Sequence, residues 1–401
     1  MSREVSLAER MSQIKPSATL AITAKAKAMR ADGINVIGFG AGEPDFDTPE
    51  HIKEAAVQAL REGFTKYTAV SGIDELKSAI CDKFSRDNGI DYELSQVVVS
   101  CGAKHSLYNL FQVVIGEGDE VIIPAPYWVS YVPQVLLAGG RPVILETTEE
   151  NAFRVDPDAL REAITPRTRA LVFNSPSNPT GCAYSRADTE RIAEIAAEAS
   201  ILVVADEVYE KIVYDGFSHT SIASLGSDIK DLTITVNAVS KTYSMTGWRI
   251  GYLAGSGEIT AAINRIQGQS TSNPTSIAQK ATIAALTGPQ DQVVEMVKTF
   301  AGRRDRMLEL LASIEGVTCI RPAGSFYAFP RFSSWYGKRH GSREINGSMD
   351  LADFLMDEAK VAVVPGSAFG ADDYIRLSYA TSMENIEEGL ERTIKAMALL
   401  E

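Results

Sequence analysis

Short apolar runs alternate with segments of helical period between about residue 50 and residue 290, and this alternation restricts the fold more than any other feature. The runs Gln96–Ser100, Arg169–Asn174, Ile201–Ala205 and Leu232–Val236 have the length and composition of buried strands. Strands that alternate with helices form a mostly parallel sheet, because each helix crosses over and returns the chain to the same end of the sheet. The sequence therefore predicts an α/β fold for this part of the chain.

The pattern changes after Pro289, where the predicted strands become shorter and the helices longer. The predicted elements include one long helix and three short strands, at Gln292–Ile314, Val317–Ile320, Ser325–Pro330 and Val361–Val364. This mixture is typical of a small α+β domain. We predict a large domain over residues 48–298 and a small domain that combines residues 1–47 with 299–401.

Charge and cysteine content exclude several classes of protein. The chain of 401 residues has a net charge of −13, which argues against binding to nucleic acid. Its four cysteines and four histidines show no metal-ligand spacing, so we expect reduced thiols, no metal site and a cytoplasmic location. We find no signal peptide at the N-terminus and no apolar run long enough to cross a bilayer, so we expect no membrane partner.

The segment Asn237–Gly251 carries the most chemically specific residues. Lys241 follows the predicted strand Leu232–Val236, and open α/β sheets bind their ligands at the carboxyl ends of strands. A buried lysine loses its charge readily and forms Schiff bases with carbonyl compounds. Ser240 adds a hydroxyl and Arg249 a guanidinium. Together they suit an aldehyde cofactor with a phosphate group, pyridoxal 5′-phosphate; the alternative is a surface lysine after a strand.

A second candidate anion site follows the strand Gln96–Ser100. Gly102 comes just after this strand, and a predicted helix continues from Ala103 and Lys104. The free backbone N–H groups and the dipole of a helix start both favour an anion, and Lys104 adds a positive charge. A phosphate is the natural occupant, and an ordinary turn between strand and helix is the alternative.

Asp206 lies at the carboxyl end of the predicted strand Ile201–Ala205. A buried carboxylate is very costly without a partner, and a protonated pyridine nitrogen would be one. The carboxylate would keep the ring protonated and able to accept electrons. Tyr209, three residues later, could bond the phenolic oxygen of the same ring. The alternative is an aspartate that caps a helix.

Three more residues can face the same ligand. Trp128 follows a predicted strand and could stack on a planar ring, or belong to the core as most tryptophans do. Asn178 lies in a loop that two prolines make stiff. Arg376 lies inside the strand-like stretch Tyr374–Tyr379 and needs an anion, because a guanidinium does not lose its charge. A substrate carboxylate would bind it bidentately, and a structural salt bridge is the alternative.

Eight short motifs occur in an order that is specific to one family. They are G-E-P-D-F, Y-T, S-C-G-A-K, P-Y-W, N-P-T-G, A-D-E-V-Y, S-K-T-Y-S-M-T-G-W-R-I-G and Y-I-R-L-S-Y. Over nearly its whole length the chain resembles the class I/II pyridoxal-phosphate aminotransferases of fold type I. It is most similar to the bacterial subgroup Ib aspartate aminotransferases, some of which act on prephenate. The resemblance implies a mostly parallel, seven-stranded sheet between helices, a small α+β domain, and a homodimer with shared active sites.

The resemblance also implies roles for the cofactor-binding residues. Lys241 would form the Schiff base and move protons, and Asp206 would pair with the pyridine nitrogen. Tyr209 and Asn178 would bond the ring oxygen, and Trp128 would stack on the ring. The residues implied to bind the phosphate are Gly102, Ala103, Lys104, Ser240 and Arg249, with Tyr67 reaching the phosphate of the neighbouring subunit.

Substrate binding is implied in the same way. The α-carboxylate would bind Arg376, Asn178 and the Gly42 backbone, with Trp128 alongside. The residues implied near a distal carboxylate are Lys104, Thr19 and Ser17. The implied reaction is ping-pong transfer of the amino group of aspartate to 2-oxoglutarate, with transamination of prephenate to arogenate as a second activity. Alternatives are an aminotransferase for aromatic or neutral amino acids, and a carbon–sulfur lyase on the same fold. A cofactor-binding regulator would need a DNA-binding module, for which the two domains leave no room.

Overall fold

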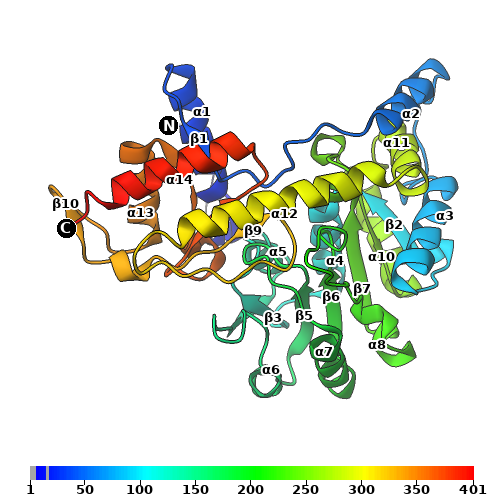
Figure 1. Ribbon diagram of the computed structural model, residues 1–401. Coiled ribbons are helices and arrows are strands. Elements are labelled where there is room, and N and C mark those ends of the chain that lie inside the picture. Colours follow the sequence, from blue (N-terminus) through cyan, green and yellow to red (C-terminus); the bar gives the residue numbers. More distant parts are fainter. Residues whose placement is uncertain (1–5, 15–17) are drawn as a thin grey trace, which may run out of the picture.

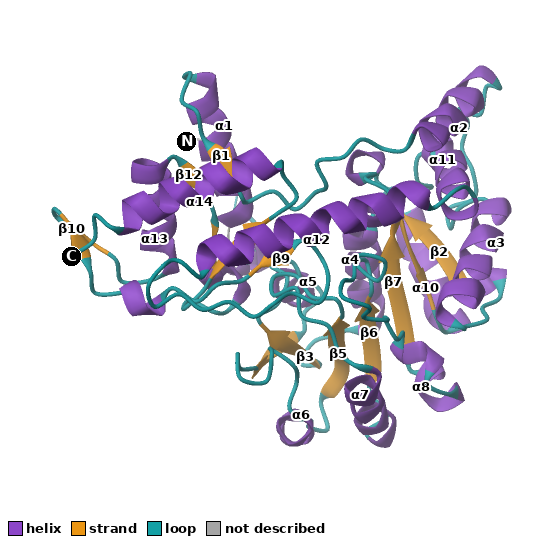
Figure 2. Ribbon diagram, viewed as in Figure 1, coloured by secondary structure: helices purple, strands orange, loops and turns teal. Residues whose placement is uncertain are grey.

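The structure is a computed structural model that describes residues 6–14 and 18–401 (Figure 1). A central sheet with surrounding helices forms one part of the molecule, and a smaller group of helices and short strands forms the other (Figure 2). The long helix α12 (Asp291–Leu311) runs from the first part to the second (Figure 1). The domain boundaries 48–298, and 1–47 with 299–401, stay a prediction.

The central sheet has seven strands in the order β2-β8-β7-β6-β5-β3-β4. Their bounds are β2 Val97–Ser100, β3 Glu120–Ala125, β4 Arg141–Glu146, β5 Thr168–Asn174, β6 Leu202–Asp206, β7 Thr233–Ala238 and β8 Gly251–Ala254. All neighbouring pairs are parallel except those of β8, which runs antiparallel to both β2 and β7. The predicted α/β fold with a mostly parallel sheet is confirmed, whereas the sequence analysis did not identify β8.

Helices cover both faces of this sheet. Their bounds are α2 Glu50–Arg61, α3 Asp74–Lys83, α4 Ala103–Val114, α5 Tyr131–Leu137, α6 Pro157–Ala163, α7 Arg186–Glu198, α8 Ser227–Asp231, α9 Val239–Thr242, α10 Gly257–Gly268 and α11 Ser276–Thr287. Alternation along β6 explains the two layers, because successive side chains of a strand point to opposite faces. Val204 packs in the cluster that contains α4, α5 and α10, and Val203 and Ala205 pack in the cluster that contains α6 and α7.

Local sequence explains where several helices begin. The Asp156 carboxylate accepts hydrogen bonds from two backbone amides at the start of α6, and Pro157 occupies its first position. Ser185 caps α7 in the same way. Thr48, in the sequence T-P-E, has the residue type of a helix cap, but it does not cap α2, because its hydroxyl donates to the Ser244 carbonyl at 2.7 Å instead. Thr48 thus ties the start of α2 to the segment after Lys241.

In the described ranges, the smaller part contains short strands and α-helices joined by short 3-10 and π-helical segments. Its elements are α1 Ala18–Ala31, β1 Ile37–Gly38, β9 Tyr327–Ala328, β10 Arg339–His340, β11 Arg343–Glu344, α13 Ser348–Phe354, β12 Val361–Ala362, β13 Val364–Pro365, β14 Ile375–Ser378 and α14 Met383–Met397, with α12 packed against α14. Strands β13, β14 and β9 form an antiparallel sheet. The predicted strand Val317–Ile320 is wrong. Of these residues only Thr318 pairs, through a single antiparallel bridge to Arg331.

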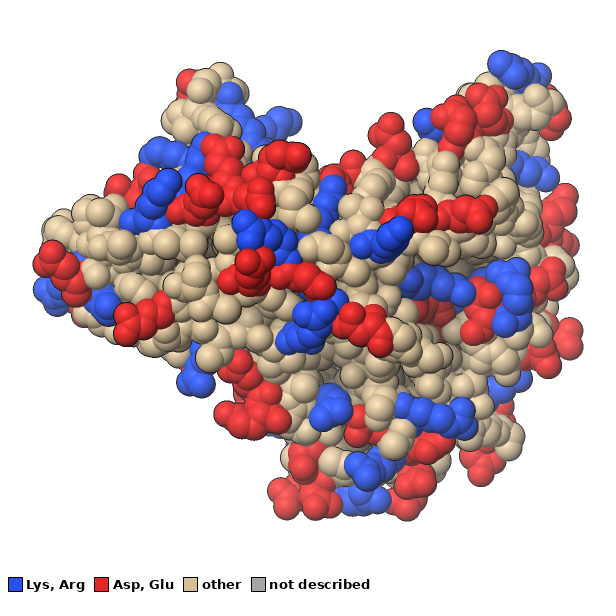
Figure 3. All heavy atoms as spheres, in the orientation of Figure 1, with Lys and Arg blue, Asp and Glu red and all other residues tan. Residues whose placement is uncertain are grey.

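The visible surface carries both signs of charge. Figure 3 shows acidic and basic side chains interspersed over the face that it presents. Such mixing differs from the basic patch that nucleic-acid binding requires. None of the helices in the described ranges has the length and apolar character needed to span a membrane.

Candidate active site

Three chain segments meet at the carboxyl ends of the neighbouring strands β5, β6 and β7. Asp206 is the last residue of β6, and Lys241 lies in α9, directly after β7. Asn174, at the end of β5, joins two of these segments through its side-chain amide. Its Nδ2 donates to the Asp206 carbonyl at 2.9 Å, and its Oδ1 accepts from the Asn178 amide at 3.0 Å. The topology thus places Asn178, Asp206 and Lys241 around one site, as ligand sites of open parallel sheets generally form.

Lys241 has the environment of a nucleophilic amine. Burial lowers the pKa of its ammonium to about 8, against the opposing effect of Glu43, and the positive charges of Arg249 and Arg376 lower it further. Its Nζ donates to the Gly42 carbonyl, so the Gly40–Gly42 loop closes over it. A lysine with this pKa is partly neutral near pH 7, which is the form that attacks a carbonyl.

Asp206 is a buried carboxylate with one strong partner. It is 4% exposed, and the Tyr131 hydroxyl donates to its Oδ2 at 2.7 Å. The Val208 amide lies 3.4 Å from its Oδ1. Burial raises the pKa of Asp206 to about 6, and the Tyr131 hydrogen bond opposes the rise. Asp206 is therefore mainly ionised at neutral pH and can hold a cationic group.

Tyr131 was missed by the sequence analysis. It begins α5, three residues after Trp128, and the two rings meet edge to face with centroids 5.3 Å apart. The only signal in the sequence is this spacing after the P-Y-W motif, which does not reveal the contact with Asp206. Trp128 itself is half-buried, with the Lys104 Nζ 5.0 Å from its ring centroid.

Arg376 is buried on β14 without a carboxylate partner in the described chain. It is 3% exposed, and it donates from Nη1 to Asn178 Oδ1 at 3.0 Å and from Nη2 to the Gly40 carbonyl at 2.9 Å. Its Nε has no hydrogen-bond partner among residues 6–14 and 18–401. A buried guanidinium with an unpaired donor and no acidic neighbour fits an external anion better than a structural salt bridge.

Tyr209 and Tyr327 lie beside Arg376. Their hydroxyls are 3.0 Å apart, and burial raises the pKa of both. The guanidinium of Arg376 stacks 4.4 Å from the Tyr327 ring centroid. The sequence analysis missed Tyr327, because its strand S-F-Y-A-F contains three aromatic residues and nothing in the pattern distinguishes them.

Arg249 and the turn before α4 form a second, more open anion site. Gly102 has φ +90°, and a Cβ at this position would collide with the Arg249 guanidinium. Arg249 has left-handed backbone dihedrals and donates to the carbonyls of Thr246 at 2.8 Å and Cys101 at 3.3 Å. The amides at the start of α4, beginning at Ala103, lie in the same turn. This cradle suits a phosphate group.

The remaining predicted residues have different positions. Ser240 is buried beside Lys241 on α9. The Lys104 side chain lies at the rim, where burial and Arg249 lower its pKa. Tyr67 is 91% exposed on a loop and is not part of this protomer's buried site. Thr19 lies in α1, and Ser17 lies outside the described residues.

A lysine of lowered pKa, a buried carboxylate and two candidate anion sites together suit a phosphorylated aldehyde and a carboxylate substrate. The model of the family "Aminotransferase class I and II" matches residues 34–392. The chain belongs to this family of transaminases, and its architecture is that of fold type I.

Similar proteins cover the whole chain. An aspartate aminotransferase of Geobacillus stearothermophilus is 51% identical over 98% of each chain. A probable aspartate/prephenate aminotransferase of Rickettsia bellii is 48% identical over 98% of this chain and 99% of that protein. The crystal structure of the aspartate aminotransferase from Rhizobium meliloti has a TM-score of 0.96 and 46% identity, covering 99% of this chain and all of the other.

Proposed function

We propose that this protein transfers the amino group of aspartate to 2-oxoglutarate, forming oxaloacetate and glutamate, with pyridoxal 5′-phosphate as cofactor. One observation carries the proposal. Arg376 is buried near Lys241 and Asp206, and no carboxylate among the described residues pairs with it. The names of the similar proteins support aspartate as the substrate.

The residues fit this cofactor in three respects. Lys241 offers an amine of lowered pKa for its aldehyde, and Asp206 offers a buried carboxylate for its ring nitrogen. Gly102 leaves open the space next to Arg249 that a Cβ would fill, which suits a phosphate. When bound, the cofactor supplies an electron-withdrawing ring that stabilises negative charge on the α-carbon of the amino acid.

The side chains of this protein then have separate tasks. Lys241 Nζ, as the neutral amine, takes the proton from the substrate α-carbon and returns a proton during the same half-reaction. Asp206, held by the Tyr131 hydroxyl, would pair with the ring nitrogen and keep it protonated. Tyr209, whose hydroxyl is already oriented by Tyr327, donates toward the ring oxygen. Because these groups are buried and oriented before substrate arrives, little reorganisation opposes the reaction.

Arg376 and Asn178 bind the substrate α-carboxylate in this proposal. The Asn178 side chain holds Nη1, so the free Nε and the edge of Nη2 face the carboxylate. Lys104, at the rim beside Trp128, is proposed to bind the distal carboxylate. A similar solved structure is that of the Thermus thermophilus aspartate aminotransferase with maleate, itself a dicarboxylate (TM-score 0.92, 43% identity).

A second activity, transamination of prephenate to arogenate, is supported by relatives named for it. The Nitrosomonas europaea aspartate/prephenate aminotransferase is 48% identical over 96% of this chain. Prephenate also carries two carboxylates, so the same two positive side chains would bind it.

We further propose a homodimer in which Tyr67 reaches the phosphate site of the other subunit. The support is its exposure, because a tyrosine that is 91% exposed has its hydroxyl free for a contact outside its own protomer. A cytoplasmic location stays a prediction from the cysteine content.

Absorbance spectra of the cofactor-loaded protein test the function. Aspartate added without any oxo acid should convert the band of the Lys241-bound cofactor to that of its amine form, with about one oxaloacetate released per site. Arogenate added in the same way tests the second activity, and alanine is the matched neutral amino acid. A band that responds to alanine but not to aspartate would discard the dicarboxylate assignment, and release of ammonia would favour the lyase alternative.

A further inference from the structure

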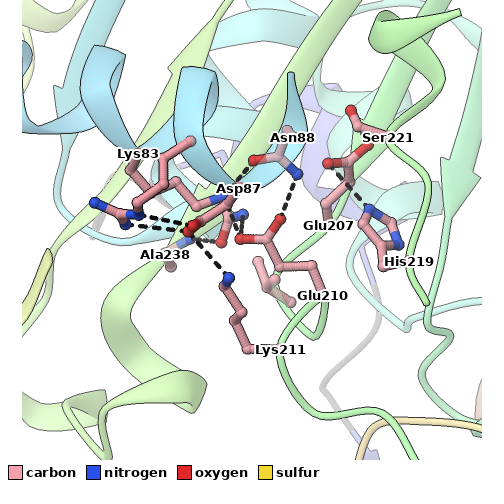
Figure 4. A network of polar contacts seen from close by, with 12 residues as sticks. Lys83, Asp87, Asn88, Glu207, Glu210, Lys211, His219, Ser221 and Ala238 are labelled. Carbon is pink, nitrogen blue, oxygen red and sulfur yellow. Dashed lines mark hydrogen bonds and ion pairs between the residues drawn. The ribbon is translucent and has the colours of Figure 1, made fainter. Parts of the chain in front are cut away.

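A second buried polar cluster is built around Glu207 and Glu210, the residues that follow Asp206 and Tyr209 in the chain (Figure 4). Its charged members are Lys83, Glu207, Glu210 and His219, which we call the ion cluster. The segment Asp206–Glu210 supplies both sites. Asp206 contacts Tyr131, and Tyr209 contacts Tyr327. The glutamate that follows each of them in the chain, Glu207 or Glu210, belongs to the ion cluster.

Glu210 has partners from three different elements. Lys83, the last residue of α3, contacts Glu210 Oε1 through its Nζ. Asn88, from the π-helical turn Phe84–Asn88, donates to Oε2 at 2.7 Å, and Asn237 of β7 donates to Oε1 at 2.9 Å. Burial raises the pKa of Glu210, but the charges of Lys83 and His219 outweigh it and hold the pKa below its ordinary value. Glu210 is therefore a fully satisfied carboxylate in the interior.

Glu207 completes the cluster. Its Oε1 accepts from the Ser221 hydroxyl at 2.7 Å, and its Oε2 lies 3.3 Å from His219 Nε2. Burial lowers the pKa of His219, but Glu207 and Glu210 outweigh it and raise the pKa. The imidazolium form balances the charges, because two carboxylates then face one ammonium and one imidazolium.

The same cluster has the composition of a metal site. One ligand atom each from Glu207, Glu210 and His219 lie within 4.8 Å of one another. A divalent cation there would meet the Lys83 ammonium, which already contacts Glu210 Oε1. The arrangement therefore favours an ion cluster over a metal centre.

Asn237 connects the ion cluster to the segment that carries Lys241. Its Nδ2 donates to Glu210, and its Oδ1 accepts from the Ala238 amide at 2.7 Å, where β7 ends and α9 begins. Glu210 is thus bonded to the end of β7, while its own backbone belongs to the segment with Asp206 and Tyr209. The Glu210 side chain thus joins Asn237 of β7 to α3 and to the π-helical turn that follows α3.

We propose that Lys83 and Glu210 are positioning residues that fix Asp206 and Tyr209 relative to Lys241. The proposal rests on the proposed function, because only there do these three residues act on one bound group. A buried ion pair is a poor source of stability, since apolar side chains of the same size often serve as well. Glu210, whose two carboxylate oxygens are both hydrogen-bonded, can however hold the chain segments that it joins in one arrangement.

The test compares Glu210→Gln, Lys83→Met and the double variant Lys83→Met/Glu210→Gln, each loaded with pyridoxal phosphate. The double variant removes both charges of the pair and leaves Glu207 and His219 balanced, so it keeps the test valid if a single variant does not fold. Three properties are measured: the pH midpoint of the absorbance change of bound cofactor, the Kd of the cofactor for the apo protein, and kcat and KM for aspartate.

We expect the midpoint to shift by about half a pH unit or more in the double variant, and kcat to fall about tenfold. The KM for aspartate should stay within about threefold, because Arg376 does not contact the ion cluster. Arg304→Met is the matched control, since it removes a buried arginine of α12 whose guanidinium lies 2.8 Å from the Asp215 carboxylate. This control should lower the midpoint temperature of unfolding without moving the pH midpoint of the cofactor absorbance.

A folded double variant that keeps both the parent's spectral midpoint and its kcat would overturn the proposal. We expect a chelator to leave the absorbance spectrum of the cofactor-loaded parent protein unchanged. A chelator that moved the pH midpoint of this absorbance would overturn the proposal in favour of a metal centre. The spectral titration needs no amino acid. If the parent protein bound the cofactor but did not react with aspartate, the proposed function would be wrong. The spectral test of the positioning residues could still be carried out.

Discussion

Two arginines of the site carry the same charge but are held in opposite ways. Arg376 lies in a regular strand, is 3% exposed, and has two hydrogen bonds and an aromatic ring that fix it. Arg249 has left-handed backbone dihedrals and an exposed side chain bonded to two carbonyls. The proposed substrate side is therefore organised before its ligand arrives, whereas the proposed phosphate side is open to water and ions. This difference predicts which constants each arginine controls.

The largest effect is expected from Arg376→Lys. A lysine cannot make the bidentate contact, and the loss of one partner from a buried charge pair costs about 2–5 kcal/mol. We expect kcat/KM for aspartate to fall about 10³-fold, with the Kd of pyridoxal phosphate changed less than about threefold. Steady-state kinetics and titration of the apo protein measure the two constants. An equal loss in both would remove the contrast between the arginines.

Arg249→Gln should have the reverse pattern and a smaller effect. Hydrogen bonds to a charged phosphate contribute about 1.5–3 kcal/mol, so the Kd of the cofactor should rise about 10- to 100-fold. At saturating cofactor, kcat should stay within about threefold. In the parent protein, added salt should weaken cofactor binding more than it raises the KM for aspartate, because exposed charges are screened and buried ones are not. A variant with normal cofactor affinity and reduced kcat would contradict the assignment.

The sequence predicted the strand ends that build the site better than the contacts across it. Lys241 and Asp206 follow apolar runs that can only be buried strands, so their positions at one end of the sheet follow from topology. Gly102 was identified for the same reason, as the residue between a strand and a helix.

Residues whose roles depend on tertiary contact were missed. Tyr131 reaches Asp206 from α5, and Tyr327 reaches Tyr209 from the smaller part, 118 residues away in the chain. Neither lies in a pattern that separates it from core aromatics. Strand β8 was missed because its four residues follow the candidate ligand-binding segment, in which the only α-helix, α9, is four residues long, and because β8 runs antiparallel to β7 and so breaks the parallel repeat.

Both arginines act on the pKa of Lys241, and this pKa predicts a pH dependence. The pKa is lowered from 10.5 in an exposed lysine to about 8, so above pH 8 the apo protein presents a neutral amine. The rate of covalent attachment of pyridoxal phosphate should rise about fivefold between pH 7 and 8 and level off above about pH 9. Between about pH 8 and 10.5 the unfolded chain binds the additional proton, so the contribution of Lys241 to stability rises with pH there.

The two arginine variants sharpen this test. Arg249→Gln removes a positive charge and should raise the midpoint, whereas Arg376→Lys keeps its positive charge and should leave the midpoint nearly unchanged. Stopped-flow absorbance from pH 6.5 to 10 measures the rate, with N-acetyl-lysine methyl ester as the exposed-amine control. A midpoint near 10 in the parent would mean that burial does not control this lysine.

The smallest effect is expected from Lys104→Ala, on the open side of the site. Its side chain is at the rim, with a pKa lowered by burial and by Arg249, and it lies over Trp128 rather than in a hydrogen-bonded frame. An ion pair in this position contributes about 0.2–1 kcal/mol, so the KM for aspartate should rise only about two- to fivefold. The KM for alanine should not change, since alanine has no distal carboxylate. Equal changes for both amino acids would mean that Lys104 serves the phosphate with Arg249, and the specificity for dicarboxylates would then come from another residue.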